Sequence, residues 1–380
     1  MRALAVALAT VALALPAAGA GGDAKIAYVL GKRATIVYLG SPLRQPIVLT
    51  RAGPPRWSGD GRLLSIGGWV VGRARLPAAQ LFWAPSGETA AYQTRDGSVL
   101  LWTPRGSRTV VPATWGATSI AWGPNGKLAL GRSVCHVPCG VPRHQEVWIW
   151  RSGSLERVAG PLSGVFRPIV AGFAPDGRVL WWPDEQGSGS IAADGLPLYA
   201  NRSRITKTLV FPDFVVRCGR HLAVVAGGDR YTTHGKRILF DGRDVSDDAT
   251  RSWVSPSCTA NGRLVAATGR NWEEDPIGAE HRAIWRLLPT RRQLTQPPPG
   301  WSDESPHLLN DGSVLFVRTR QTARKQNGEW ITTSRGRLER LLRGKLTEIA
   351  DVSFAAKDTS GVWLNYYGHY NWADRIAISP

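Results

Sequence analysis

Short apolar runs recur along most of the chain, and each is bounded by Gly, Pro, Asn or Asp. Short runs of this kind are typical of β-strands, and the turn residues between them are typical of hairpins. Helical periodicity is nearly absent: residues 335–348 have the best helical pattern, and Gly336 and Gly344 within them argue against a helix. The pattern therefore predicts an all-β fold.

One unit of this pattern repeats along the chain. An aromatic or apolar residue is followed by two or three small or polar residues, a glycine, a spacer and an apolar strand. Asp-Gly and Asn-Gly pairs such as Asp176-Gly177 supply a tight turn, because glycine tolerates positive φ and Asp or Asn tolerates it better than most residues. The copies are WSGDGRLLSI (57–66), WAPSGETAAY (83–92), WGPNGKLALG (122–131), FAPDGRVLWW (173–182), CTANGRLVAA (258–267) and LLNDGSVLFV (308–317), with degraded copies at 216–225 and 354–364.

The spacing of these copies indicates a β-propeller. Their glycines lie 39–51 residues apart, except for a first gap of 26 residues, and a period of ~40–50 residues is typical of propeller blades. Residues 81–111 fit one four-stranded antiparallel blade. We expect the leading aromatic residue of each copy to end an inner strand and to pack between blades. We predict seven blades, with six and eight as the alternatives, and a truncated blade around residues 57–75.

The ends of the chain are expected to close the ring. Three strands are predicted before the first copy, and two follow the last one. An open array would leave unpaired strand edges, so we expect the N-terminal strand to complete the last blade, with both termini sealing the ring. These strands are predicted at residues 26–30, 34–39, 46–50, 362–367 and 375–379.

With these repeats the chain resembles the TolB-type, WD40-like propellers of bacterial exported proteins. Their repeat has the form aromatic-Ser/Ala-Pro-Asp-Gly followed by an apolar strand, and WAPSGETAAY and FAPDGRVLWW match it well. The resemblance implies a propeller that acts as a binding platform for a protein partner. It does not imply a particular activity, although some relatives carry enzymatic sites.

The N-terminus has the form of a secretory signal peptide. Arg2 precedes the apolar residues 3–15, and Ala18-Gly19-Ala20 gives a small-x-small cleavage site. We predict a signal peptide at 1–20 and a single propeller domain at 21–380, in a protein that is periplasmic, cell-wall-associated or secreted. A retained N-terminal anchor is the alternative, although spanning a bilayer usually takes ~20 apolar residues. No other segment is apolar enough to cross a membrane.

The four cysteines suggest disulfides, since the protein is expected to be exported. Three connectivities are possible, and we favour Cys135–Cys139 together with Cys218–Cys258. Cys135 and Cys139 could instead bind zinc with His144, but their spacing differs from that of a standard zinc knuckle. We predict no metal site and no cofactor.

Positive charge dominates the composition, with 47 Lys and Arg against 29 Asp and Glu and a net charge of +18. Such a balance favours an anionic partner, and predicted export excludes nucleic acid. The basic residues are nevertheless scattered singly among turns. Typical positions are Arg51, Arg56, Arg62, Arg73 and Arg75.

Residues that could carry chemistry do not form a recognisable motif. A Gly-x-Ser-x-Gly elbow is absent from the sequence. The pairs Asp184-Glu185 and Asp303-Glu304 could serve in acid–base work, but sequence does not show whether either has the required geometry. The acidic segment 241–248 lacks the spacing of a calcium loop, and we interpret it as a solvated turn. We predict no catalytic residue.

An aromatic segment near the C-terminus is the candidate binding surface, because aromatic faces with polar tips suit sugar rings and protein hot spots. Alternatively, its residues face neighbouring blades. The hypothesis is an exported, non-catalytic propeller that binds a protein or cell-envelope partner; the alternative is a carbohydrate-directed propeller, either a lectin-like binder or a polysaccharide lyase or hydrolase. The candidate residues are Tyr366, Tyr367, His369, Tyr370 and Trp372.

Overall fold

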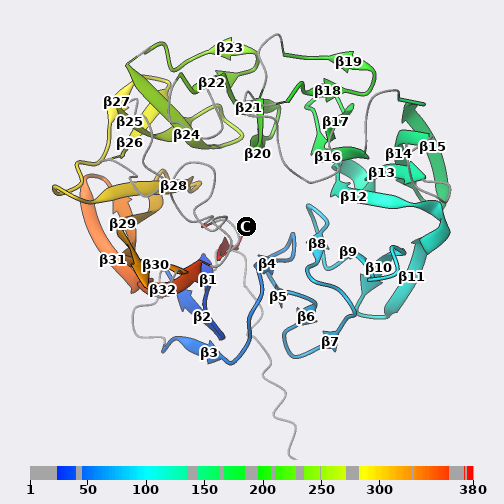
Figure 1. Ribbon diagram of the computed structural model, residues 1–380, viewed down its shortest axis with the longest axis horizontal. Coiled ribbons are helices and arrows are strands. Elements are labelled where there is room, and N and C mark those ends of the chain that lie inside the picture. The colour runs from blue at the N-terminus through cyan, green and yellow to red at the C-terminus, as the bar shows by residue number, and fades with distance from the viewer. Residues whose placement is uncertain are drawn as a thin grey trace, which may run out of the picture.

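The strands form a ring of antiparallel sheets around a central axis (Figure 1). The computed structural model describes residues 24–39, 45–134, 144–162, 167–184, 196–206, 210–227, 235–248, 250–270, 282–326, 329–358, 372 and 375–379. Within these residues there are eight sheets, seven with four strands and one with five. None of the helices in these ranges is long and apolar enough to span a membrane.

Each sheet is one blade of an all-β propeller, numbered here in chain order. The blades are blade 1 (β1 Lys25–Leu30, β2 Arg33–Tyr38, β3 Ile47–Leu49 and β33 Ile376–Ile378), blade 2 (β4 Pro55–Trp57, β5 Leu64–Ile66, β6 Trp69–Val70, β7 Ala74–Arg75), blade 3 (β8 Phe82–Trp83, β9 Ala90–Gln93, β10 Val99–Thr103, β11 Gly106–Val111) and blade 4 (β12 Ala117–Trp122, β13 Leu128–Val134, β14 His144–Arg151, β15 Ser154–Ala159). They continue with blade 5 (β16 Arg167–Phe173, β17 Val179–Asp184, β18 Tyr199–Ala200, β19 Ser203–Arg204), blade 6 (β20 Val210–Cys218, β21 His221–Ala226, β22 Arg237–Phe240, β23 Arg243–Asp244), blade 7 (β24 Arg251–Cys258, β25 Leu264–Arg270, β26 Ala283–Leu288, β27 Arg292–Gln293) and blade 8 (β28 Ser302–Leu308, β29 Val314–Gln326, β30 Glu329–Leu342, β31 Lys345–Asp351, β32 Phe354–Asp358).

The prediction of seven blades is wrong: the described strands form eight. Residues 57–75, expected to hold a truncated blade, lie in blade 2, which is complete but has strands of only two or three residues. Blade 1 has no repeat motif, because its inner strand β33 and its neighbour β1 come from opposite ends of the chain. Seven copies of the motif mark blades 2 to 8, and the degraded copy at 354–364 begins in β32 of blade 8, so the blade that closes the ring has no copy of its own.

Both termini contribute to this closing blade. The inner strand β33 pairs antiparallel with β1, with Ile378 opposite Ile26 and Ile376 opposite Tyr28. Backbone bonds extend the pairing, since the Ser379 N–H donates to the Lys25 carbonyl at 2.8 Å. Three N-terminal strands and one C-terminal strand thus share one sheet, and this pairing joins the two ends of the array.

The repeated Asp-Gly pairs are turns, as predicted. Between β16 and β17, Gly177 has φ 85°, a conformation that favours glycine. The Arg178 N–H donates to Asp176 Oδ1 at 3.0 Å, and the Gly177 N–H donates to the Ala174 carbonyl at 2.9 Å. Asp311 has the same role between β28 and β29, accepting from the Ser313 N–H at 2.8 Å. The pair is therefore part of the fold and marks the inner hairpin of a blade.

The leading tryptophan of three repeats connects neighbouring blades. The indole N–H of Trp57, at the end of β4, donates to the Ala377 carbonyl of blade 1 at 3.2 Å. Trp83 makes the same bond from blade 3 to the Arg56 carbonyl of blade 2 at 3.2 Å, and Trp122 makes it from blade 4 to the Phe82 carbonyl of blade 3 at 2.7 Å. The predicted packing of these aromatic residues between blades is confirmed, and their hydrogen bonds fix the position of each blade against the preceding one.

The hydrophobic core lies between the faces of adjacent blades. In one cluster, Leu101 and Val111 of blade 3 pack with Leu128, Leu130 and Trp150 of blade 4. A blade buries one face against each neighbour, so a single blade would leave both faces exposed to water. The ring is therefore required for the stability of its parts.

Candidate functional site

A cleft of about 790 Å³ lies at the junction of blades 2 and 3. Its walls come from the segment before β4, from strands β5–β9 and their connections, and from the turn after β9. Of the lining residues, Ile66 alone belongs to a copy of the repeat motif. The lining residues are Arg51, Ala52, Ile66, Gly68, Trp69, Arg75, Leu76, Pro77, Ala78, Ala79, Gln80, Phe82, Gln93, Thr94 and Arg95.

A glycine shapes one wall of the cleft. A Cβ atom on Gly68 would lie 2.2 Å from the Ala78 carbonyl oxygen and 2.6 Å from that of Leu76. The Leu76 N–H donates to the Gly68 carbonyl at 2.8 Å. The connection between β7 and β8 is therefore held against the turn before β6, and only glycine allows this close approach.

Three exposed arginines surround the cleft: Arg51, Arg75 and Arg95. The Arg51 guanidinium carbon lies 5.0 Å from the ring centroid of the half-buried Trp69, a cation–π distance. Among the described lining residues there is no Asp or Glu. The cleft therefore combines concentrated positive charge with an aromatic surface.

Polar groups on β9 and its turn complete the lining. The Gln93 side-chain amide donates to the Ala117 carbonyl at 2.8 Å, which fixes its orientation. The Thr94 hydroxyl bonds to Asp96, the nearest acidic residue in sequence to Arg95. Hydrogen bonds from Thr94 and Ser98 hold the pKa of Asp96 below its usual value. The Asp96 carboxylate is thus engaged in its own turn.

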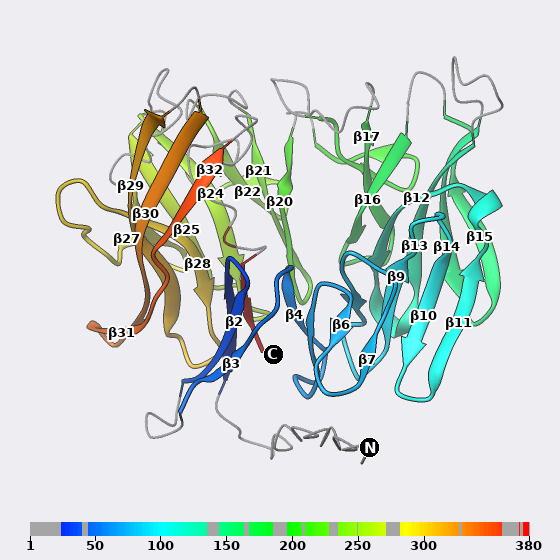
Figure 2. The ribbon, with the colours of Figure 1, turned by 60° about the horizontal axis from the view of Figure 1, so that its bottom comes forward.

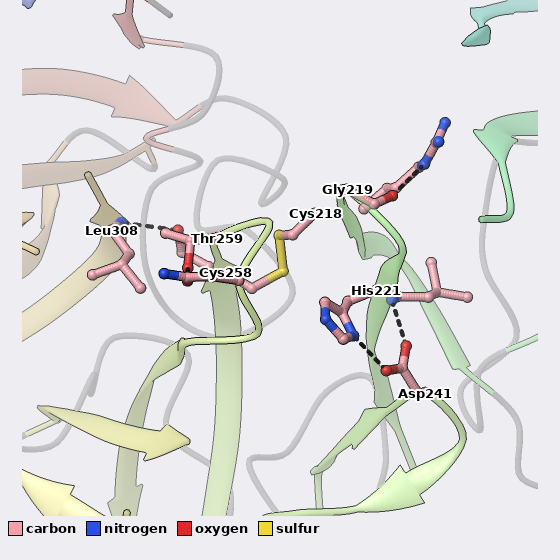
Figure 3. The surroundings of a disulfide bond; sticks show 11 residues. Cys218, Gly219, His221, Asp241, Cys258, Thr259 and Leu308 are labelled. Atoms are coloured by element: carbon pink, nitrogen blue, oxygen red, sulfur yellow. Dashed lines mark hydrogen bonds and ion pairs between the residues drawn. A yellow bond between two sulfur atoms is a disulfide. The ribbon is translucent and has the colours of Figure 1, made fainter. Parts of the chain in front are cut away.

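The predicted Cys218–Cys258 disulfide is confirmed (Figure 3). It joins the ends of β20 and β24, the inner strands of blades 6 and 7, with a Cα–Cα distance of 5.6 Å. Each cysteine is the last residue of its inner strand, the position that Trp57 and Trp122 occupy in blades 2 and 4. The bond therefore provides the same blade-to-blade connection covalently. Cys135 and Cys139 lie outside the described residues, so that pair remains a prediction.

Replacing Cys218 and Cys258 together by Ala is expected to lower the free energy of unfolding by about 2–4 kcal/mol. The disulfide closes a loop with a sequence separation of 40 residues, which restricts the unfolded chain. Urea unfolding of both proteins under non-reducing conditions measures the difference. Equal unfolding midpoints and slopes would show that the disulfide contributes nothing to stability.

Carboxylates of the acidic segment 241–248 form hydrogen bonds and ion pairs with neighbouring residues of the protein. Asp241 Oδ2 lies 2.6 Å from His221 Nδ1, next to the disulfide in Figure 3, and Asp241 Oδ1 accepts from the Leu222 N–H at 2.9 Å. Asp244 accepts from the Ser246 hydroxyl at 2.6 Å. Asp248 lies 3.2 Å from Arg291. The part of the chain that the structure describes contains no group of three or more His, Cys, Asp or Glu placed to hold a metal.

The pair Asp303-Glu304 is buried in blade 8. Asp303 accepts two hydrogen bonds from Arg318, at 2.7 and 2.9 Å, and Arg318 also lies 3.2 Å from Glu339. Burial raises the pKa of Glu304 to about 8, although Arg282 and Trp372 oppose the shift. Both side chains are inaccessible to solvent. Of the other predicted pair, Asp184 ends β17 and Glu185 lies outside the described residues.

Of the candidate aromatic residues, the structure describes Trp372. Its side chain is 2% exposed and packs in a core cluster with Ile26, Leu315 and Val352. This residue therefore supports the junction of blades 1 and 8. Tyr366, Tyr367, His369 and Tyr370 lie outside the described residues.

Sequence reasoning missed the cleft. Arg51 and Arg75 were interpreted as isolated surface charges, yet the short strands of blade 2 bring them to one opening. Two features of the sequence point to this region: Trp69, and the connection 76–80, which lies between two copies of the repeat and belongs to neither.

No protein-family model and no curated protein matches the chain. Several solved structures resemble it. Acylaminoacyl peptidase from Pyrococcus horikoshii is 11% identical with a TM-score of 0.45, over 84% of this chain and 48% of the peptidase, so the chain spans about half of that protein. The propeller domain of the Trilobed protease from Pyrococcus furiosus is 12% identical with a TM-score of 0.39, over 87% of this chain and 98% of that domain. A GH74 xyloglucanase from Xanthomonas campestris is 15% identical with a TM-score of 0.39, over 70% of this chain and 44% of the enzyme.

Proposed function

We propose that the chain is an exported, non-catalytic propeller of the TolB type that binds an anionic glycan of the cell envelope in the cleft between blades 2 and 3. The observation that carries the proposal is the set of three exposed arginines around Trp69, with no carboxylate among the described lining residues. The signal-peptide pattern and the Cys218–Cys258 disulfide support export. The form of the repeats supports the TolB-type assignment.

The lining suits a ligand that has both a ring and a negative charge. A guanidinium group pairs with carboxylate or phosphate through two parallel hydrogen bonds. The half-buried rings of Trp69 and Phe82 offer apolar surface to the face of a sugar. An acidic sugar such as a uronate supplies both partners.

The walls of the cleft are preorganised for binding. The Trp83 indole N–H contacts the Arg56 carbonyl at 3.2 Å and the Ser65 hydroxyl at 3.0 Å, which joins blade 3 to blade 2 beside the cleft. A rigid site loses less conformational entropy when a ligand binds. Glycoside hydrolysis ordinarily uses two carboxyl groups flanking the bond, and the described lining offers Thr94 and two glutamines instead.

Replacing Arg51, Arg75 and Arg95 by Gln is expected to weaken the binding of oligogalacturonate by at least about tenfold. A hydrogen bond to a charged group contributes roughly 1.5–3 kcal/mol, and 1.4 kcal/mol corresponds to a factor of ten in Kd. Isothermal titration calorimetry measures the change. Binding by the unaltered protein is also expected to weaken as salt is raised from 50 to 500 mM.

The matched control replaces three exposed arginines outside the cleft, Arg33, Arg105 and Arg151, by Gln. This variant has the same net charge as the cleft variant and is expected to keep most of the affinity. Equal losses in both variants would mean that the general positive charge binds the polymer, and the proposal would fail. Release of unsaturated or reducing ends from the oligomer would refute the non-catalytic assignment.

A further inference from the structure

The middle strands of blade 8 form a ribbon longer than the hairpins of its neighbour. β29 has 13 residues and β30 has 14, whereas β25 and β26 of blade 7 have 7 and 6. Figure 2 shows β29 and β30 extending to the upper rim of the ring, with β32 beside β30. The upper half of this ribbon thus extends past the ends of β28 and β31.

One edge of the upper ribbon has no partner strand among the described residues. β28 pairs with β29 at residues 314–319, and the register stops there. On the opposite side, β30 pairs with β31 at residues 337–342 and with β32 at residues 330–334. Residues 320–326 of β29 therefore pair with β30 on one side, and on the other side no described strand pairs with their backbone.

This free edge begins at a pair of arginines that directly face each other. In the register of β29 and β30, Arg320 is opposite Arg335. This pair lies two residues along the ribbon from the pair Arg318 and Arg337. Like charges at directly opposed positions destabilise a sheet. In the lower pair the charge is compensated, because Arg318 binds Asp303 and Glu339, and Arg337 lies 3.6 Å from Glu348.

The upper pair has no such compensation. Arg320 and Arg335 are both exposed, and no carboxylate of the described residues forms an ion pair with either. The strand then continues through two further basic residues, Arg324 and Lys325, at register positions opposite Ile331 and Trp330. Among the described residues, the edge therefore combines backbone groups that have no partner strand with the exposed charges of Arg320 and Arg335.

We propose that residues 320–326 of β29 are a docking edge for an extended acidic peptide segment of a partner protein, which adds a strand to blade 8. Backbone hydrogen bonds along a free edge provide affinity in this mode of recognition. Complementary charge provides orientation and a faster association rate. The partner's carboxylates would also relieve the repulsion between Arg320 and Arg335. Basic residues on an edge strand can alternatively serve only to prevent aggregation.

The test uses the full chain and an eight-residue peptide of alternating Glu and Val carrying a fluorophore. Fluorescence anisotropy is expected to show saturable binding. The double variant Arg320→Glu, Arg335→Glu is expected to weaken binding at least about tenfold and to bind the matching Lys–Val peptide instead. The control is Arg343→Glu, Lys345→Glu, which changes the net charge equally at the exposed turn between β30 and β31.

A second peptide separates strand addition from simple charge attraction. N-methylation of alternate backbone nitrogens keeps its charge but removes the N–H groups that pair with an edge, and is expected to abolish binding. Equal binding of both peptides, or equal loss in both protein variants, would overturn the proposal. The cleft variant Arg51→Gln, Arg75→Gln, Arg95→Gln is expected to bind the peptide as the unaltered protein does. The proposal for this edge and the proposal for the cleft are therefore tested independently.

Discussion

A chain that ends after Trp372 is expected to unfold at a temperature lower by about 10 °C or more, because the ring opens at blade 1. The truncation removes β33, the inner strand of that blade. Ile376 and Ile378 pack in the core cluster with Ile26 and Leu338, and Ala377 packs in the next cluster with Trp57. Fully burying an isoleucine side chain contributes roughly 1.5–3 kcal/mol, and the two partly buried isoleucines contribute less than that each. Together with the lost hydrogen bonds, the effect is still a large part of the 5–15 kcal/mol typical of a domain.

Lost hydrogen bonds add to this effect. The Val29 N–H loses the Arg375 carbonyl, which it contacts at 2.8 Å, and the Trp57 indole loses the Ala377 carbonyl. The inner edge of β1 then becomes an unpaired strand edge, which favours aggregation.

Differential scanning calorimetry of the truncated and complete chains measures the change. A chain that lacks only Pro380 is the control and is expected to melt like the complete chain. Adding a synthetic peptide of residues 372–380 is expected to restore much of the lost stability. If the truncated chain melts at the original temperature, closure by the C-terminal strand does not hold the ring together.

Replacing Glu304 by Gln is expected to remove a loss of stability that the unaltered protein shows as pH rises from about 4.5 to about 8. Glu304 is fully buried on β28, and burial raises its pKa from 4.5 to about 8. The folded state therefore retains a proton that the unfolded chain releases near pH 4.5. The free energy of unfolding falls as pH increases from 4.5 to 8, and the whole effect is about 5 kcal/mol above pH 8.

Gln has nearly the same shape and carries no charge, so the variant lacks this dependence. Its advantage over the unaltered protein is expected to be small at pH 5 and to approach 5 kcal/mol at pH 9. Urea unfolding at pH 5, 7 and 9 gives the free energies. Glu348→Gln, at a half-exposed carboxylate of the same blade, is the control and should leave the profile unchanged. Parallel profiles for Glu304→Gln and the unaltered protein would show that Glu304 does not ionise in this range.

The sequence predicted the blade pattern because local chemistry determines it. Asp176-Gly177 and Asp311-Gly312 each form their turn within a few residues, and Trp57, Trp83 and Trp122 occupy equivalent positions. The Cys218–Cys258 disulfide was one of the pairings favoured from the even number of cysteines, and the structure places the two residues at the ends of neighbouring inner strands. Gly336 and Gly344 argued against a helix at residues 335–348, and the structure has strands β30 and β31 there.

The number of blades and the cleft depend on contacts between distant segments. The sequence predicted that the two termini close the ring, but not that β33 and three N-terminal strands form a blade separate from blade 8. Arg51, Trp69 and Arg95 line one cleft because three connections of blades 2 and 3 meet there. Neither the spacing nor the composition of the sequence determines where such connections converge.

The most direct measurement for the proposed function is a crystal structure of the protein with an oligogalacturonate. We expect a sugar ring to lie against Trp69 and its carboxylate to contact Arg51, Arg75 or Arg95. Oligomer bound at another surface, with the cleft between blades 2 and 3 unoccupied at saturating concentration, would contradict it.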